Sequence, residues 1–230
     1  MSTLRNIPAM LAKDLVLDIV PPLKTTDTGL KALHWMDEFK VSHLPIVNSS
    51  EFLGLISDAD ILDLNAPEES IGNHRLSLIR PFIDKDAHVF EALKMVTEMH
   101  LSLVPVVDTA TKEYVGVITT QYLAEQVALM IGSQEPGGII MLEVDEKDYT
   151  LAQIAQIVEG NDSKILSVFT YKNPDANDLL VTIKTNRVEL NSVLQTFNRY
   201  QYNVVASYHT DAFGDDLKAR YDLFMNYINM

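Results

Sequence analysis

The sequence contains no cysteine, and this absence removes several kinds of chemistry at once. Without thiols the chain forms no disulfides, no thiolate metal sites and no cysteine nucleophile. A chain of 230 residues buries well over half of its unfolded surface, so a core can form without disulfides or metal sites. The lack of cysteine fits a reducing compartment, and the first residues carry no apolar signal-peptide core. We therefore expect a cytoplasmic protein.

Long apolar runs and basic clusters are also lacking. No run approaches the ~20 apolar residues that a membrane helix needs, so we expect no membrane partner. Lys and Arg number 18 against 32 Asp and Glu, which gives a formal net charge of −14. Because contact with phosphate backbones needs clustered Lys and Arg, we expect no nucleic-acid partner. The acidic balance is interpreted as a source of solubility.

Recognisable catalytic and metal-binding patterns are missing as well. The six histidines show no metal-ligand spacing such as HxxxH on one helix, so we expect no metal site. No carboxylate pair stands out as acid and base, and there is no GxSxG, Walker loop or GxGxxG. The sequence therefore predicts a protein that is not an enzyme, with no catalytic residue and no required cofactor.

What the sequence does contain is an internal repeat in its first half. Ala32 matches Ala92 and Pro45 matches Pro105, a constant offset of 60 residues. After a two-residue insertion, the Gly-bearing segment 54–57 matches 116–119. Each copy reads as strand–helix–strand–strand–helix, and its helical stripe recurs every three or four residues. One copy alone would leave its sheet face exposed, so the two must pack together.

The repeat resembles the CBS domain family, whose motifs occur as tandem pairs. The matching residues are the strands His43-Leu44-Pro45-Ile46-Val47 and Leu103-Val104-Pro105-Val106-Val107, and the segment Gly54-Leu55-Ile56-Ser57-Asp58-Ala59-Asp60. The resemblance implies βαββα units at 8–68 and 69–131 that form one regulatory module. It also implies an adenosine-containing effector bound between the motifs, such as AMP or S-adenosylmethionine.

In that family the Gly-x-x-Ser/Thr-x-x-Asp segment contacts the ligand. Ser57 would then lie at a helix N-terminus, where free N–H groups favour a phosphate. Asp60 would accept two hydrogen bonds from a ribose diol. The alternative is that Ser57 only caps the helix and Asp60 only favours its first turn. The full expected site comprises Val20, Pro21, Pro22, His43, Leu44, Ser57, Asp58 and Asp60.

The second copy departs from this pattern. It reads Thr119-Thr120-Gln121-Tyr122, so the hydroxyl cap survives while Tyr122 stands where the acidic residue would be. A possible second site would use Pro81, Val104, Thr119 and Thr120. A structural interaction module with vestigial ligand sites therefore stays open as the alternative function.

Charge around the first segment bears on the choice of ligand. Asp58, Asp60 and Asp63 would repel a polyphosphate unless a cation or a basic residue such as Arg80 helped. We therefore expect AMP or S-adenosylmethionine to bind better than metal-free ATP.

The second half has a different pattern. A Gly/Pro-rich stretch at 132–138 reads as a linker, and 139–230 follow a βαββαβ order, the ferredoxin-like arrangement. This resembles an ACT-type domain, and the whole layout resembles that of the acetoin-utilisation regulatory B proteins. The loop Asp145-Glu146-Lys147-Asp148 is acidic and lacks glycine, so a dimerisation sheet is favoured over an amino-acid site.

The end of the sequence predicts one more helix. Residues 215–229 carry an apolar stripe at helical spacing, which suits packing on this domain or on a partner subunit. The stripe consists of Leu217, Tyr221, Phe224 and Ile228. We expect an α/β (α+β) homodimer that acts on a regulated target of unknown identity.

Overall fold

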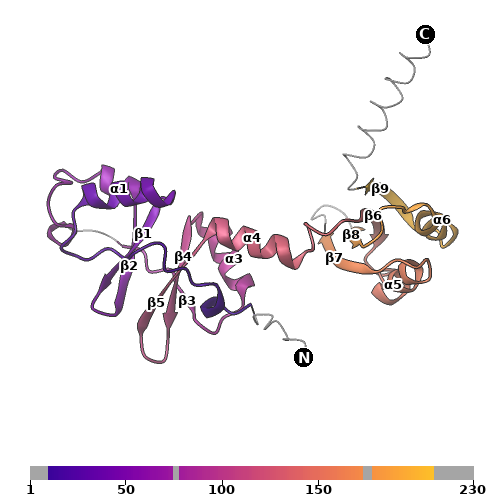
Figure 1. The fold of residues 1–230 in the computed structure, drawn as a ribbon, viewed down its shortest axis with the longest axis horizontal. Coiled ribbons are helices and arrows are strands. Elements are labelled where there is room, and N and C mark those ends of the chain that lie inside the picture. The colour runs from indigo at the N-terminus through magenta and orange to yellow at the C-terminus, as the bar shows by residue number, and fades with distance from the viewer. Residues whose placement is uncertain (1–9, 75–77, 173–177, 210–230) are drawn as a thin grey trace, which may run out of the picture. The chain divides into compact units, whose positions relative to one another are not determined.

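The computed structural model describes residues 10–74, 78–172 and 178–209, and Figure 1 shows the order of their elements. The chain divides into two compact units, Met1–Gln126 and Val127–Met230. The division falls inside a helix, α4 (Thr120–Met130). Each unit has its own sheet and its own buried apolar residues.

The first unit contains the repeat, and both copies fold alike. The first copy comprises α1 (Gly29–Phe39), β1 (His43–Asn48), β2 (Glu51–Ser57) and α2 (Asp58–Leu62). The second comprises β3 (Ile83–Asp84), α3 (Val89–Met99), β4 (Leu103–Asp108), β5 (Glu113–Thr119) and α4. Short 3-10 turns at Ala12–Leu15 and Ile71–Asn73 complete the unit. The helices α1 and α3 end at the equivalent residues Lys40 and His100, both in the left-handed conformation.

The strands form one sheet in the order β1-β2-β5-β4-β3. Each copy supplies an antiparallel hairpin, and both hairpins have an irregularity at the same place, Ile46/Val47 and Val106/Val107. The leading strand predicted for the first copy is reduced to a single parallel bridge between Leu23 and Ile46. Pro21 and Pro22 precede it and have no N–H to donate to a strand ladder.

The two copies share their packing. Leu101, Leu103 and Val117 of the second copy lie in one buried cluster with Leu44 and Ile56 of the first. The chain leading into each copy also bridges to the other copy, through Leu17 with Val117 and Leu55 with Ile79. The expectation that two thin units pack into one module is confirmed.

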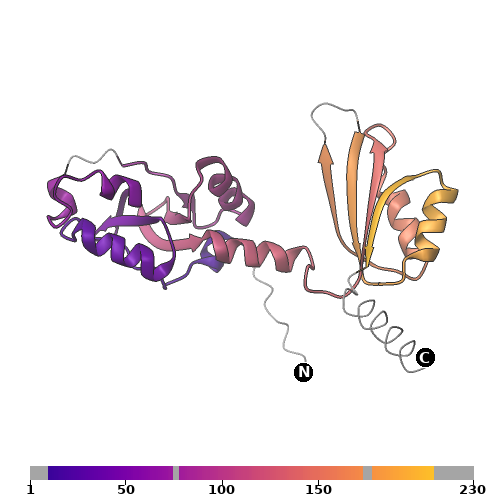
Figure 2. The same cartoon turned by 90° about the horizontal axis from the view of Figure 1, so that it is seen from above.

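The second unit has the predicted βαββαβ order. Its elements are β6 (Gly138–Asp145), α5 (Leu151–Glu159), β7 (Ile165–Lys172), β8 (Asp178–Thr185), α6 (Asn191–Arg199) and β9 (Asn203–His209). The sheet order is β7-β8-β6-β9 with every neighbouring pair antiparallel, which is the ferredoxin-like topology. Figure 2 shows both helices on one side of this sheet. Between helices and sheet lies a core built around Ile140, Val158 and Phe197.

One prediction concerns residues that the structure does not describe. The predicted helix at 215–229 lies outside the described residues. Within the described ranges, no helix is long and apolar enough to cross a membrane. Among those same residues, no group of three or more His, Asp and Glu is placed to hold a metal ion.

Candidate ligand site of the repeat pair

The two copies are joined by hydrogen bonds just before β1 and β4. The Ser42 N–H donates to Ser102 Oγ at 3.0 Å, and His43 Nδ1 lies 3.1 Å from the same oxygen. The Ser102 N–H in turn points to His43 Nδ1 at 3.4 Å. Ser102 is the repeat counterpart of Ser42, whereas the counterpart of His43 is Leu103. We call this set, Ser42, His43 and Ser102, the central node. Both copies supply the serine, but only the first copy supplies a histidine.

Burial of His43 favours the neutral form of its imidazole. Burial lowers the pKa of His43, while the nearby carboxylates Asp58 and Asp60 act in the opposite direction. A neutral ring with its proton on Nε2 leaves Nδ1 free to accept, which suits both contacts with Ser102. The register of the hairpin places His43 opposite Ser57, the residue that precedes α2, so His43 and the start of α2 lie together.

At the start of α2, Ser57 and Asp60 form hydrogen bonds with each other. The Asp60 N–H donates to Ser57 Oγ at 3.1 Å, which is the cap expected from the sequence. The Asp60 Oδ2 atom accepts from the Ser57 N–H at 2.8 Å and from Ser57 Oγ at 2.6 Å, which completes a capping box. A ribose diol would have to use the other oxygen of Asp60 or open this box. This geometry favours the capping role that the sequence left as the alternative.

The start of α4 is arranged differently. Thr119 Oγ1 accepts from the Tyr122 N–H at 3.2 Å, so the second copy keeps its hydroxyl cap. Thr120 Oγ1 donates to the Leu101 carbonyl at 2.8 Å, and the Thr120 N–H donates to the Ser102 carbonyl at 2.9 Å. These bonds join the helix start to the central node, and the start of α2 is joined to it in the same way, because the Asp58 N–H donates to the Ser42 carbonyl at 3.1 Å.

A cavity of about 330 Å³ opens at this second helix start. It is lined by the ends of α1 and α3, by the two node serines and by the start of α4: Phe39, Lys40, Val41, Ser42, His100, Leu101, Ser102, Thr119, Thr120 and Gln121. Of the predicted site residues it contains Thr119 and Thr120, and its lining does not include Ser57 or Asp60. Sequence reasoning missed Ser42 and Ser102, although their 60-residue spacing identifies them as a matched pair.

The other six predicted contacts are buried or half-buried in the structure. Leu44 and Val104 are fully buried, each in the core of its own side of the sheet. Val20 and Pro81 are buried as well, while Pro21 and Pro22 are half-buried. Contact of these six side chains with a ligand stays a prediction.

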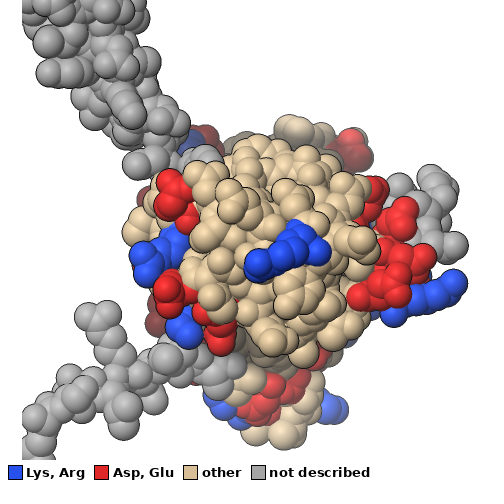
Figure 3. Space-filling model, turned by 90° about the vertical axis from the view of Figure 1, so that its right-hand side faces the viewer, with Lys and Arg blue, Asp and Glu red and all other residues tan. Residues whose placement is uncertain are grey.

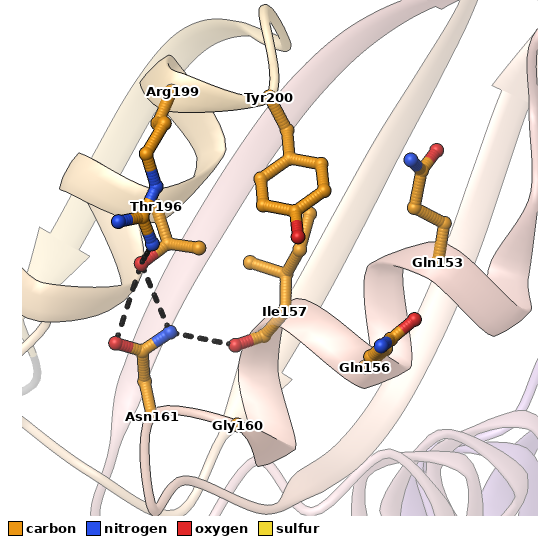
Figure 4. Close-up of a pocket in the computed structure, with 8 residues that line it drawn as sticks. All are labelled: Gln153, Gln156, Ile157, Gly160, Asn161, Thr196, Arg199 and Tyr200. Atoms are coloured by element: carbon orange, nitrogen blue, oxygen red, sulfur yellow. Dashed lines mark hydrogen bonds between the residues drawn. The ribbon is translucent and has the colours of Figure 1, made fainter.

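The second unit has a hollow of about 270 Å³ between α5 and α6 (Figure 4). Asn161 lines this hollow and links the two helices, because its Nδ2 donates to the Ile157 carbonyl at 2.8 Å and to Thr196 Oγ1 at 3.1 Å. Arg199 is the single Lys or Arg within α5 and α6. Figure 3 accordingly shows a broad face of uncharged side chains around one basic side chain. The hollow thus offers amides and hydroxyls but little charge.

Comparison with known proteins agrees with the repeat. The CBS domain family profile matches residues 12–66 and 79–128. The chain therefore carries a CBS domain pair, and such pairs are generally regulatory, ligand-binding modules rather than catalytic ones.

Several solved structures resemble about half of the chain. A CBS domain pair/ACT domain protein from Thermotoga maritima is 23% identical over 52% of this chain and 98% of its own, with a TM-score of 0.46. CBSX2 in complex with AMP is 19% identical over 52% of this chain and 97% of its own, with a TM-score of 0.44. The CBS domain of the bacterial CNNM/CorC family Mg²⁺ transporter in complex with ATP is 14% identical over 52% and 87%, with a TM-score of 0.41.

Proposed function

We propose that this protein is a regulatory, non-catalytic sensor that binds an adenosine-containing ligand through its CBS pair. The observation that supports this most is the position of the central node. On one side of the node, the carboxylates at the start of α2 interact electrostatically with His43. On the other side, Ser42 and Ser102 line the cavity at the start of α4. A ligand at either helix start would therefore act on the hydrogen bonds that join the two copies.

The chemistry of the cavity suits a nucleoside monophosphate. Its volume lies at the lower end of the ~300–1,000 Å³ range of ligand pockets. Hydroxyls of Ser42, Ser102 and Thr119 and the N-terminal end of α4 can receive ribose and phosphate oxygens. Lys40 is the nearby cation, and it also pairs with Asp37 at 2.9 Å. One phosphate suits this limited charge better than three.

The charges at the start of α2 also favour a ligand with one phosphate, or none, over a ligand with three. Asp58 and Asp60 are exposed there, and further phosphates would meet their negative charge. We propose AMP or S-adenosylmethionine as the effector, bound in preference to metal-free ATP, with no cofactor required. We also propose that ligand binds at one site per chain, because the two helix starts differ in their acidic residue.

The test is calorimetric titration of the full chain with AMP, S-adenosylmethionine and ATP in metal-free buffer. Asp60→Ala should remove most AMP binding if Asp60 holds the ribose, whereas Asp63→Ala, an exposed acid at the end of the same helix, should not. Loss of the Asp60 cap should cost only about 1 kcal/mol of stability. Undiminished AMP binding by Asp60→Ala would show that its role is the cap alone. Two equal sites per chain would contradict the stoichiometry, and tightest binding by ATP would contradict the charge argument.

A second candidate function has its own support. The Asp60 carboxylate is already occupied by the capping box, and the equivalent position holds Tyr122. Both facts fit a structural interaction module whose ligand sites are vestigial. In a thermal-shift series, a ligand at 100 times its dissociation constant should add about 2.7 kcal/mol of stability. No shift with any of the three adenosyl compounds would favour this second function.

We further propose a homodimer whose second unit is an ACT-like packing domain, in the layout of the acetoin-utilisation regulatory B proteins. The boundaries 8–68, 69–131, 132–138 and 139–230 and the cytoplasmic location belong to the same proposal. Its support is the ferredoxin-like sheet, in which β7 and β9 are the edge strands among the described residues and can pair with another chain. Light scattering at micromolar concentration should give twice the chain mass, and a monomer mass would contradict the dimer.

A further inference from the structure

The sheet of the second unit has one face that its helices do not cover. The residues that pack against α5 and α6 alternate along each strand, as Ile140 and Leu142 do in β6. The residues between them point to the opposite face. The strand register confirms this alternation, because Met141 pairs with Thr182 of β8, while Leu142 pairs with the buried Val181.

The middle of the uncovered face carries uncharged side chains, with Glu143 and Lys184 on the same face one row to either side. The row Phe169, Thr182, Met141 and Ala206 crosses all four strands in register. Phe169 is 45% exposed, and two further aromatic residues, Tyr171 and Tyr208, are 63% and 55% exposed. Scattered apolar side chains are ordinary on a surface, but a continuous patch of large ones marks an interaction surface. We call this set, Met141, Phe169, Tyr171, Thr182, Ala206 and Tyr208, the open sheet face.

We propose that residues 215–229 of the same chain cover the open sheet face as an amphipathic helix. The sequence of this segment has a stripe of Leu217, Tyr221, Phe224 and Ile228, which needs an apolar partner. A single contact would bury both the stripe and the open sheet face. This inference concerns the second unit only and does not depend on the proposed ligand sensing.

The place where β9 ends makes this contact reachable. β9 ends at His209, which pairs with Gly138 at the first residue of β6. Residues 210–214 then provide up to ~17 Å of extended chain, including Gly214 for a turn. That reach exceeds the ~10 Å that separate a sheet from a packed layer.

The lengths also agree. Fifteen helical residues span ~22 Å, and the eight residues of β6 span ~23 Å from first to last. A helix running back along β6 from the Gly138 end would therefore cross the central row with its middle. The covalent connection favours the chain's own segment over that of a second copy, because attachment through a short linker gives a millimolar effective concentration.

The absence of native cysteine allows a clean test by disulfide trapping. The full chain carrying Thr182→Cys and Tyr221→Cys would be oxidised and run on a non-reducing gel. Its control carries Gln156→Cys and Tyr221→Cys, since Gln156 is exposed on α5 at the other side of the sheet. We expect an intrachain disulfide to form roughly tenfold faster in the first pair than in the control. Unchanged melting of the reduced variants would show that both are folded.

Each other outcome overturns the proposal. A disulfide-linked dimer would show that a second copy covers the face, and equal rates in both pairs would show that the segment does not dock. A matched set of substitutions tests the stripe in the trapping background. Leu217→Ser with Phe224→Ser should reduce trapping to the control rate, whereas Asp222→Ser with Asn226→Ser, off the stripe, should leave it fast. Equal effects of the two sets would also refute the docked helix.

Discussion

Gly54 and Gly116 are the repeat-related glycines of the two hairpins, and each lies where the chain leading into the other copy crosses it. A Cβ atom at Gly54 would lie 2.7 Å from Leu78 Cβ and 2.8 Å from the Ile79 carbonyl oxygen. At Gly116 the corresponding contact is with Val16 Cγ1. Both glycines have φ near +155°, a backbone conformation that side chains disfavour. We therefore predict that alanine destabilises both positions, and Gly54 more than Gly116.

The difference follows from what each Cβ would meet. The Ile79 carbonyl accepts a hydrogen bond from the Leu55 N–H at 2.9 Å, so it cannot retreat without loss of that bond. Val16 Cγ1 is the end of a side chain and can move. Backbone strain of about 1–3 kcal/mol and overpacking of about 1–3 kcal/mol give about 2–6 kcal/mol for Gly54→Ala. Such a loss is a large part of the ~5–15 kcal/mol that stabilises a typical domain.

Urea unfolding followed by Trp35 fluorescence measures this loss. Trp35 is the single tryptophan and packs against the shared core of the first unit. Val16→Ala should restore part of the stability of Gly116→Ala, whereas Leu78→Ala should restore little to Gly54→Ala, because the Ile79 carbonyl remains. A Gly54→Ala variant within about 0.5 kcal/mol of the parent, or more stable than Gly116→Ala, would refute the reasoning.

Two further predictions concern hydrogen bonds inside each unit. Because burial lowers the folded-state pKa of His43 below the ordinary ~6.5, its contribution to stability is complete above that pH and declines as the pH falls below it. His43→Leu, the residue of the other copy, should weaken this decline in urea melts between about pH 7.5 and 5.5, and an unchanged decline would contradict the assignment. In the second unit, Asn161→Ala removes the bonds to Ile157 and Thr196 and should cost about 1–2 kcal/mol by circular dichroism, whereas exposed Asn198→Ala should cost almost nothing.

The fold of the first unit could be predicted from the sequence because the same pattern occurs twice, once in each copy. The helical stripe, the Pro-bearing strand and the Gly-bearing strand recur in the same order, and the structure places them at equivalent positions. In the second unit the sequence pattern predicted the βαββαβ order that the structure has. The cap residue Ser57 was also predictable, since a hydroxyl before a helix is typical of its N-terminal cap.

The candidate site was less predictable, for reasons that lie in tertiary packing. Spacing places Asp60 at the helix start, but it does not show that its carboxylate turns back onto Ser57. Spacing likewise does not show how deeply Leu44 and Val104 are buried. Ser42 and Ser102 carry no motif, so only their contact across the two copies reveals them.

The central node also indicates how a ligand signal could leave the first unit. Its hydrogen bonds join segments 59 and 60 residues apart, so their geometry reports on how the two copies are paired. Ser102 is bonded through its carbonyl to Thr120, the first residue of α4, and α4 is the helix in which the chain passes from one unit to the next. A ligand that changed the node would therefore act at the start of the connecting helix. An exchange of His43 for leucine removes the node's one titratable group while keeping its serines, and it separates the role of the histidine from that of the pairing itself.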